Sequence, residues 1–434
     1  MVKNNGSSDG YLLSKANSYY IFSLLFLLYM FDYIDRLVVV SLFPYLQKDW
    51  GLTDTQCGLL VSAVYWSIVL FSFPVSIIID RWSRKKSIGI MAVLWNLATA
   101  ACAFASNFTH LFMARSAIGI GEAGYAPGGT AMISALFPEK KRAMLVGIWN
   151  ISIPLGSALG VALGGYIAAH YGWRHAFGLV ALPGLIIALL FFFVRDYKTV
   201  ELVKSQNTTS DCPTPKKMKT PDIVREFAHT PSLLLTYIGF AGNTFLTTSI
   251  LSWLPTYLHR FENLPMERAS IMGSLVLLLA IVGSPLGGYL ADKWLKKKGN
   301  ARLLFSALSS TMTAVIFILA FGLFSGSTQY VLFLLGGVSA IAFASSAIAV
   351  TQDVVHPGLR AISYSMCVIV QNLLGSSLGP IFTGFISDQY DLKTALTVIS
   401  FFPLLAGIFF YLGSRFYERD LAKVEKIAVC LEEG

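Results

Sequence analysis

Long apolar segments alternate with short polar breaks along the chain from Tyr19 to Arg415. A helix rises about 1.5 Å per residue, so about 20 apolar residues cross the roughly 30 Å hydrocarbon core of a bilayer. Segments of this length occur twelve times, over 19–44, 58–80, 87–106, 110–136, 143–169, 174–194, 231–258, 269–291, 301–324, 329–350, 361–387 and 394–414. The pattern predicts an all-α polytopic membrane protein with twelve transmembrane helices.

One polar stretch, 196–230, is much longer than the other interior breaks and carries Pro213, Pro215 and the basic run Lys216–Lys219. This composition favours a linker over a further helix. It divides the helices into six and six. We expect an N-terminal six-helix bundle over 1–195, a cytoplasmic linker over 196–230, and a C-terminal six-helix bundle with a tail over 231–434.

The two halves of the chain resemble each other. A shift of 219 positions places Gly156-x-x-x-Gly160 of the fifth predicted helix on Gly375-x-x-x-Gly379 of the eleventh. Parallel six-helix repeats of this kind predict two pseudo-symmetric bundles about an axis along the membrane normal, with the substrate path between them. Rocking of the two bundles would give alternating access, and the small-residue spacing would permit close packing and motion.

The charge of the chain is low in amount and uneven in place. Charged residues make up 13% of the sequence and hydrophobic residues 55%, with a net charge of +9. If the N-terminus lies inside, 26 of the 33 basic residues fall on the cytoplasmic side of the predicted helices. This positive-inside distribution accounts for the net charge without a nucleic-acid partner, and it predicts that both termini are cytoplasmic.

Several motifs carry a family resemblance. The loop Asp80-Arg81-Trp82-Ser83-Arg84-Lys85 and its copy at Asp292 resemble the cytoplasmic gate motif of the major facilitator superfamily. Within that superfamily, the following stretches resemble the spinster family: Tyr33-Ile34-Asp35-Arg36, Gly119–Pro127, Gly172–Phe177 and Val355–Ala361. The resemblance implies a transporter of lysophospholipids or sphingosine-phosphate-like amphiphiles, often proton-coupled. Neighbouring families with a similar fold transport organic anions.

Asp80 and Arg84 lie at the predicted cytoplasmic end of the second helix, and Asp292 lies at the same end of the eighth. Aspartate–arginine pairs between the halves at this end would latch the outward-facing state. We expect these three residues to form a cytoplasmic gate. The alternative is a solvated basic loop.

Five ionisable residues lie inside the predicted helices: Asp32, Asp35, Arg36, Arg115 and Glu122. A charge at the bilayer centre costs about 2.5–3.5 kcal/mol, so such residues normally face a cavity or a partner. At about 1.5 Å per residue, Asp32 and Glu122 both fall roughly 18 Å below the outer surface, so the two groups of charges can meet.

We expect Asp35 and Glu122, with Asp32, to be the proton-coupling groups, because opening and closing a cavity changes the environment of a buried carboxylate. Arg36 or Arg115 would be the competing counter-ion and the anchor of an anionic headgroup, with Glu122 also at the binding site. The alternative is a permanent salt bridge that only joins the first and fourth helices.

The second half offers polar side chains for the remaining wall of a binding site. These are Asn243, Thr247 and Trp253 in the seventh helix and Asn372 in the eleventh. We predict that they contact the substrate. The alternative is that they only hydrogen-bond to neighbouring helices, as polar residues in membranes often do.

No pattern indicates enzyme chemistry, a cofactor or a metal. The match Gly119-x-Gly121-x-x-Gly124 to the dinucleotide fingerprint lies inside an apolar helix and not in a βαβ unit, and a Walker A sequence is absent. The five cysteines lack metal-ligand spacing.

The prediction is a proton-coupled transporter of an amphiphile, a monomer in the bacterial cytoplasmic (inner) membrane with a proton and membrane lipids as partners. The alternatives are an organic-anion symporter, a uniporter for the same lipids, and a receptor or scaffold.

Overall fold

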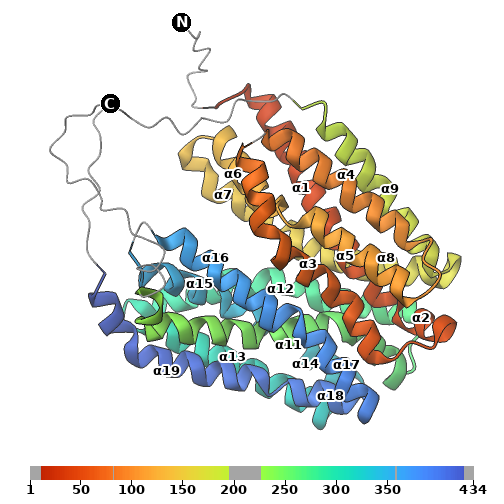
Figure 1. The fold of residues 1–434 in the computed structure, drawn as a ribbon. Coiled ribbons are helices and arrows are strands. Elements are labelled where there is room, and N and C mark those ends of the chain that lie inside the picture. Colours follow the sequence, from red (N-terminus) through yellow and green to blue (C-terminus); the bar gives the residue numbers. More distant parts are fainter. Residues whose placement is uncertain (1–10, 82, 195–225, 357–358, 425–434) are drawn as a thin grey trace, which may run out of the picture.

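The structure is a computed structural model that describes residues 11–81, 83–194, 226–356 and 359–424. The described part is almost entirely helical (Figure 1). In chain order the elements are α1 (Lys15–Leu37), the 3₁₀ helix η1 (Val38–Leu42), α2 (Phe43–Trp50), α3 (Asp54–Arg81), α4 (Arg84–Cys102), α5 (Phe108–Glu122), α6 (Tyr125–Leu136), α7 (Glu139–Asn150), α8 (Ser152–Tyr171), α9 (Trp173–Phe191), α11 (Pro231–Phe261), α12 (Met266–Leu295), α13 (Ala301–Gly322), α14 (Gly326–Ala342), α15 (Ala344–Asp353), α16 (Arg360–Val370), the π-helix η3 (Gln371–Ser376), α17 (Leu378–Gln389), α18 (Leu392–Ile399) and α19 (Phe402–Ala422). The twelve predicted spans all fall on these helices, so the fold class is confirmed.

Within the described residues, nine of these spans are long and apolar enough to cross a membrane by length and composition alone. The other three are α1, α4 and the α5–α6 pair, which carry the buried charges or a basic first turn. Large apolar side chains lie exposed on the outside of the bundle, for example Leu70 at 71%, Phe193 at 84% and Leu323 at 76%. Such a surface is stable in lipid and not in water, so the chain is an integral membrane protein.

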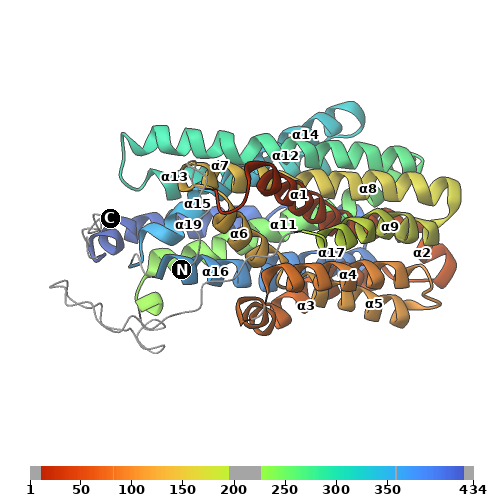
Figure 2. The ribbon, with the colours of Figure 1, turned by 90° about the horizontal axis from the view of Figure 1, so that it is seen from above.

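One end of the bundle is the end at which α9 stops. Four helices begin there, namely α1, α7, α11 and α16. We call this the linker end. The opposite end carries α2, α18 and the first residue of α3, and we call it the Asp54 end (Figures 1 and 2). Most of the predicted linker 196–230, including Lys216–Lys219, lies outside the described residues.

Several of the predicted single helices are interrupted; the span 394–414 is broken at Ser400 and Phe401, between α18 and α19, and four others are broken at equivalent places in the two halves. In the first half, α5 gives way to α6 at Ala123 and Gly124, and α7 gives way to α8 at Ile151. Pro127 lies four residues after Ala123, and Pro154 lies four residues after Asn150, the last residue of α7. A proline has no N–H for the carbonyl four residues earlier. The uninterrupted spans 110–136 and 143–169 were therefore wrong in this detail.

The second half is interrupted at the equivalent places. Helix α14 gives way to α15 at Phe343, and α16 passes through the π-helix η3 before α17 begins. The shift of 219 residues carries Ile151 to Val370, the last residue of α16. The spans 329–350 and 361–387 are thus also broken, and the internal repeat extends to the breaks themselves.

Equivalent glycines make equivalent contacts in the two halves. A Cβ atom at Gly156 of α8 would lie 2.3 Å from the Met30 carbonyl oxygen of α1, and one at Gly375 would lie 2.8 Å from the Ala241 carbonyl oxygen of α11. Helix α8 also packs across the molecular midline on α12, as α17 packs on α3. The fifth and eleventh helices therefore join the two bundles by a pseudo-two-fold relation.

Candidate functional site

Arg36 is the centre of a buried charge cluster formed by α1 and α5. Its Nη2 lies 2.8 Å from Oδ2 of Asp32, one turn earlier on α1, and its Nε lies 2.8 Å from Oε2 of Glu122 on α5. The rings of Tyr33 and Tyr65 lie 4.6 and 6.0 Å from the guanidinium carbon. The structure thus brings together Asp32 and Glu122, which the depth estimate had placed at one level.

The two carboxylates are held differently. Arg36 donates a hydrogen bond of 3.1 Å to Oδ1 of Asp32 in addition to the ion pair. Glu122 is close enough for an ion pair, but neither of its carboxylate oxygens has a partner with hydrogen-bond geometry among the described residues. Asp32 therefore contacts Arg36 from one turn earlier on the same helix, whereas Glu122 forms its ion pair with Arg36 from another helix.

Arg115 is fully buried and bonds to main-chain carbonyls. Its Nε donates to Leu60 O at 3.1 Å, Nη1 to Asp35 O at 2.9 Å and Nη2 to Arg36 O at 2.9 Å. The last two carbonyls lie where α1 changes into the 3₁₀ helix η1, so they need donors other than the helix's own amides. Arg115 therefore caps this end of α1, and its guanidinium bonds to main-chain carbonyls rather than to the Glu122 carboxylate.

Asp35 is a buried carboxylate with few partners. Its side chain has no exposed surface, and neither carboxylate oxygen has a hydrogen-bond partner among the described residues. The Thr99 side chain of α4 lies close to the carboxylate, and its hydroxyl donates to Trp95 O. Arg115 bonds to the main chain of Asp35 rather than to its carboxylate.

The cluster as a whole has unequal numbers of acids and bases. It holds three carboxylates (Asp32, Asp35, Glu122) and two guanidiniums (Arg36, Arg115), all buried except for 11% of the Arg36 side chain. With every group ionised it would carry one uncompensated negative charge. An uncompensated charge in a buried site is costly, so a single bound proton would make the cluster neutral.

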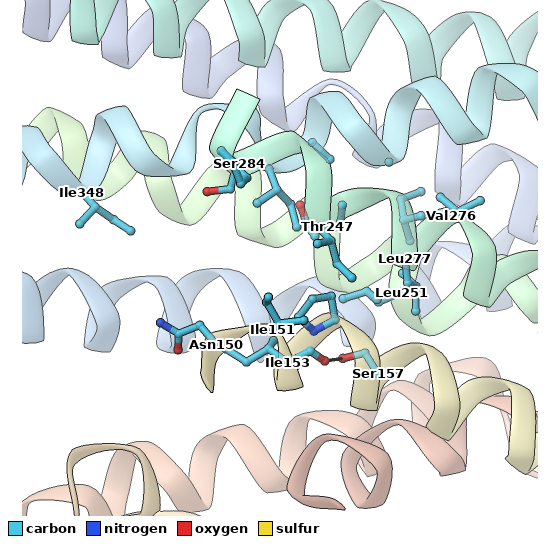
Figure 3. A pocket seen from close by; sticks show the side chains of 18 of the residues that line it. Asn150, Ile151, Ile153, Ser157, Thr247, Leu251, Val276, Leu277, Ser284 and Ile348 are labelled. Carbon is cyan, nitrogen blue, oxygen red and sulfur yellow. Dashed lines mark hydrogen bonds between the residues drawn. The ribbon is translucent and has the colours of Figure 1, made fainter. Parts of the chain in front are cut away.

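A cavity of about 460 Å³ lies between the two halves, from the middle of the bundle toward the linker end. Figure 3 shows side chains of α8, including Ile153 and Ser157, facing Thr247 and Leu251 of α11 and Leu277 of α12. Its lining is mainly apolar. None of the five charged residues lines this cavity, although Gly156, next to Ser157, packs on the α1 turn that precedes Arg36.

Of the residues expected at the binding site in the second half, Thr247 lines the cavity. Asn243 is buried and donates to Gly239 O and to the Ser310 hydroxyl. Trp253 is buried, and its indole donates to Pro380 O at 3.0 Å. Asn372 lies in η3 and accepts from the Ser376 hydroxyl at 3.1 Å. These three therefore bond to neighbouring helices or within their own helix.

Filling the cavity is expected to block transport. Thr247→Trp would place an indole into the space between α8, α11 and α12, and a close-packed interior has no room for both it and a substrate. We expect liposomes that contain the variant to take up labelled substrate at least tenfold more slowly than liposomes that contain the wild type. Expression of the variant should be unchanged. Thr247→Ser removes only a methyl group and is the matched control. Normal uptake by Thr247→Trp would place the substrate path elsewhere.

At the Asp54 end the two halves are joined by an ion pair that the sequence had not indicated. Arg260 of α11 donates to both oxygens of Asp54, at 2.8 and 2.6 Å, and to Gln47 at 2.8 Å. The Ser387 hydroxyl donates to Asp54 at 2.5 Å. Asp388 accepts from the backbone amides of Asp54 and Thr55, the first residues of α3. A carboxylate from one half thus caps a helix of the other half.

Closer to the bundle centre, the halves remain in contact. The Ser270 hydroxyl of α12 donates to the Ser41 hydroxyl at 3.0 Å, and both residues are fully buried. The Phe43 and Trp253 rings lie 5.0 Å apart. We call the contacts of Asp54 with Arg260 and of Asp388 with the α3 N-terminus the Asp54 latch. The molecule is closed on this side of the cavity.

At the linker end, a group of ion pairs joins helices of the second half. Asp292 and Asp353 both contact Arg302, and the Tyr417 hydroxyl donates to Asp353. Asp292, expected at a gate between the halves, therefore bonds within its own half in this conformation. The side chain of Asp80 lies outside the described residues, so its pairing with Arg84 stays a prediction.

Two comparisons by sequence agree with this architecture. The family model described as Major Facilitator Superfamily matches residues 25–380. A hexuronate transporter of Bacillus subtilis is 29% identical over 377 residues, covering 84% of this chain and 87% of the relative. Protein spinster homolog 1 of Xenopus laevis is 26% identical over 445 residues, covering 95% of this chain and 84% of the relative. The spinster resemblance expected from the motifs is confirmed.

A solved structure has the same fold. It is described as a bacterial homolog to the human lysosomal transporter spinster in an inward-facing and unoccupied conformation. It superposes with a TM-score of 0.82 at 22% identity, covering 94% of this chain and 99% of that one. The chain belongs to the Major Facilitator Superfamily of transporters, and within it the chain is similar to the spinster proteins over nearly its whole length.

Proposed function

We propose that the chain is a proton-coupled secondary transporter that moves a lysophospholipid or sphingosine-phosphate-like amphiphile by alternating access. The observation that carries the proposal is the cluster of three carboxylates and two guanidiniums beside a mainly apolar cavity. The cavity suits an acyl chain, and the cluster suits an anionic headgroup and a proton. The spinster resemblance supports the same substrate class.

The coupling step would be competition for Arg36. Its guanidinium is the one charged group of the cluster with an exposed edge, at 11% of the side chain. An anionic headgroup that binds there would compete with Glu122, which reaches Arg36 from another helix. A displaced carboxylate in a dehydrated site favours its protonated form, so substrate binding and proton binding would occur together. Asp35 is the second candidate carrier of the proton.

In this proposal the linker end is cytoplasmic. Basic residues gather at that end in Lys140–Arg142, Lys296–Lys298 and Arg302, as the positive-inside rule expects of short cytoplasmic loops. The conformation would then be inward-facing, with the Asp54 latch closing the outer side. In the outward-facing state Asp80, Arg84 and Asp292 would form the cytoplasmic gate. We propose the bacterial cytoplasmic membrane as its location.

The experiment that tests the proposal uses purified protein in liposomes with a pH gradient and labelled lysophosphatidylcholine. Uptake that follows the gradient and carries protons supports it. Uptake that is indifferent to the gradient would replace it with a uniporter. Absence of uptake for every substrate offered would favour a receptor or scaffold.

A second candidate is a proton-coupled organic-anion symporter. The observation that favours it is the similarity to the hexuronate transporter, together with Arg36 as an anion-binding group. Glucuronate in the same liposomes separates the two. If glucuronate moves protons and lysophosphatidylcholine does not, the organic-anion function replaces the lipid function.

Breaking the Asp54 latch is expected to open the outer side. Asp54→Asn removes the charge that Arg260 binds, and a hydrogen bond to a charged group contributes on the order of 2 kcal/mol, or about thirtyfold in a population ratio. Spin labels at the exposed positions Lys48 and Lys393, one in each half, should show a longer mean distance in the variant.

Asp49→Asn is the matched control for this experiment. Asp49 lies at the same end but accepts from Trp173 of its own half, so its removal should leave the distance unchanged. An unchanged distance in Asp54→Asn as well would mean that the latch does not set the conformation.

A further inference from the structure

The start of α1 and the turn between α6 and α7 enclose a basic pocket at the linker end. The pocket has a volume of about 280 Å³ and is lined by Tyr11, Lys15, Pro138, Lys140 and Lys141. Figure 2 shows the start of α1 beside α6 and α7. Nothing in the transport cycle proposed above uses this pocket.

The pocket exists because the segment before α1 is packed on the α6–α7 turn. The Leu12 amide donates to Leu136 O at 3.4 Å. The Tyr11 ring packs edge-on against Phe137 at 5.7 Å and is 6% exposed. Phe137 also contacts Tyr19 of α1 at 5.2 Å. These contacts fix Tyr11 as a wall of the pocket rather than as part of a free tail.

Three lysines converge on this wall. Nζ of Lys141 donates to the Tyr11 hydroxyl at 3.0 Å and lies 5.6 Å from the centre of the ring. Lys15 and Lys140 are exposed and line the same pocket. One tyrosine therefore orients one ammonium group, and two more ammonium groups, each with three donors, border the pocket.

Two helix N-termini add to the positive potential. Helix α1 begins at Lys15, after the Ser14 cap, and α7 begins at Glu139, whose side chain is outside the described residues. The first turn of a helix presents unpaired amides and the positive end of the helix dipole. Lysine cations beside such termini are a typical environment for a phosphate group.

We propose that this pocket binds a phosphate group, namely the headgroup of an anionic membrane lipid. The pocket lies at the linker end of the bundle, beside the first turns of α1 and α7, and lysines next to the end of a membrane helix attract anionic headgroups. The bound headgroup would join the N-terminal segment to the α6–α7 turn, and so would stabilise the linker-end halves of the fourth and fifth helices.

The test is thermal unfolding of the purified full chain in detergent, titrated with phosphatidylglycerol or, as the neutral comparison, phosphatidylcholine. We expect phosphatidylglycerol alone to raise the unfolding temperature. The double variant Lys15→Ser with Lys140→Ser should need on the order of 25-fold more lipid for the same rise, since each cation near a headgroup is worth about fivefold. Tyr11→Phe removes the hydroxyl that orients Lys141. This variant should need more phosphatidylglycerol than the wild type, but less than the double lysine variant.

The matched control is Lys296→Ser with Lys297→Ser, two exposed lysines at the same end outside the pocket. This control should titrate like the wild type. Equal titration curves for both double variants, or no response to phosphatidylglycerol in the wild type, would overturn the proposal.

Inorganic phosphate at matched concentration distinguishes the source of the ligand. If phosphate alone gives the full rise, and only with the pocket lysines present, the pocket is a phosphate site but its ligand is soluble rather than a lipid. Counting bound phosphatidylglycerol by native mass spectrometry gives a second readout that does not depend on how the variants unfold.

Discussion

Glu122→Gln is expected to abolish substrate-driven proton movement while leaving the protein folded. The substitution keeps the shape of the side chain but removes one of the three carboxylates that face two guanidiniums. Two acids and two bases are neutral without a bound proton, so the cluster of the variant has no reason to take one up. The proton flux that accompanies lysophosphatidylcholine in liposomes should fall to the background of empty liposomes.

The same variant separates coupling from binding. Arg36 stays hydrogen-bonded to Asp32, and its second side becomes free for a headgroup, so exchange of labelled substrate at equal concentrations should persist. Glu418→Gln, an exposed glutamate at the linker end, is the control for the loss of one acid. Proton flux at the wild-type rate in Glu122→Gln would show that Glu122 only joins α5 to α1.

Asp35→Asn gives an independent reading of which carboxylate carries the proton. It restores the same charge balance but leaves the Arg36–Glu122 contact in place. Proton flux that accompanies lysophosphatidylcholine in liposomes is measured for this variant beside Glu122→Gln. Loss of flux in both variants would mean that coupling needs both carboxylates, whereas flux at the wild-type rate in Asp35→Asn would leave Glu122 as the proton carrier.

Arg115→Ala is expected to destabilise the protein severely. The side chain makes three hydrogen bonds to main-chain carbonyls and has no exposed surface, so its removal leaves Leu60 O, Asp35 O and Arg36 O without that donor. Hydrogen bonds to a charged group contribute about 1.5–3 kcal/mol each, and the loss of three should cost on the order of 5 kcal/mol or more. The yield of monodisperse protein after heating in detergent measures it.

Arg115→Lys should recover little of this stability, because an ammonium group cannot match the planar spacing of a guanidinium bonded to carbonyls of two different helices. Arg174→Ala, at a half-exposed arginine near the Asp54 end, should have a small effect. A variant Arg115→Ala that survives heating like the wild type, yet fails to transport, would instead assign Arg115 to substrate binding.

The predictions for Glu122 and Arg115 give different roles to Arg36 and Arg115, which the sequence pattern alone does not distinguish. Arg36 contacts carboxylates and retains an exposed edge, whereas Arg115 serves the main chain at the junction of α1 and η1. The first role is suited to a step that changes during transport. The second fixes the end of α1, and thus the position of Asp32, Asp35 and Arg36, in every conformation.

The sequence by itself determined the number of helices, their grouping into two halves and the depth of the buried charges. Hydropathy is a local property, and the rise per residue of a helix is constant, so Asp32 and Glu122 could be placed at one level before any contact was known. The shift of 219 residues likewise placed Gly156 and Gly375 in equivalent packing positions.

Only the tertiary structure decided which way each side chain turns and which distant residues meet. Depth does not give the rotation of a helix, so it could not show that Arg115 caps α1 while Arg36 binds Glu122. Asp54 and Arg260 are 206 residues apart. The basic pocket at Tyr11 is formed by the segment before α1, the start of α1 and the α6–α7 turn. Such contacts depend on how whole helices pack, and a pattern of apolar and polar positions carries no information about that packing.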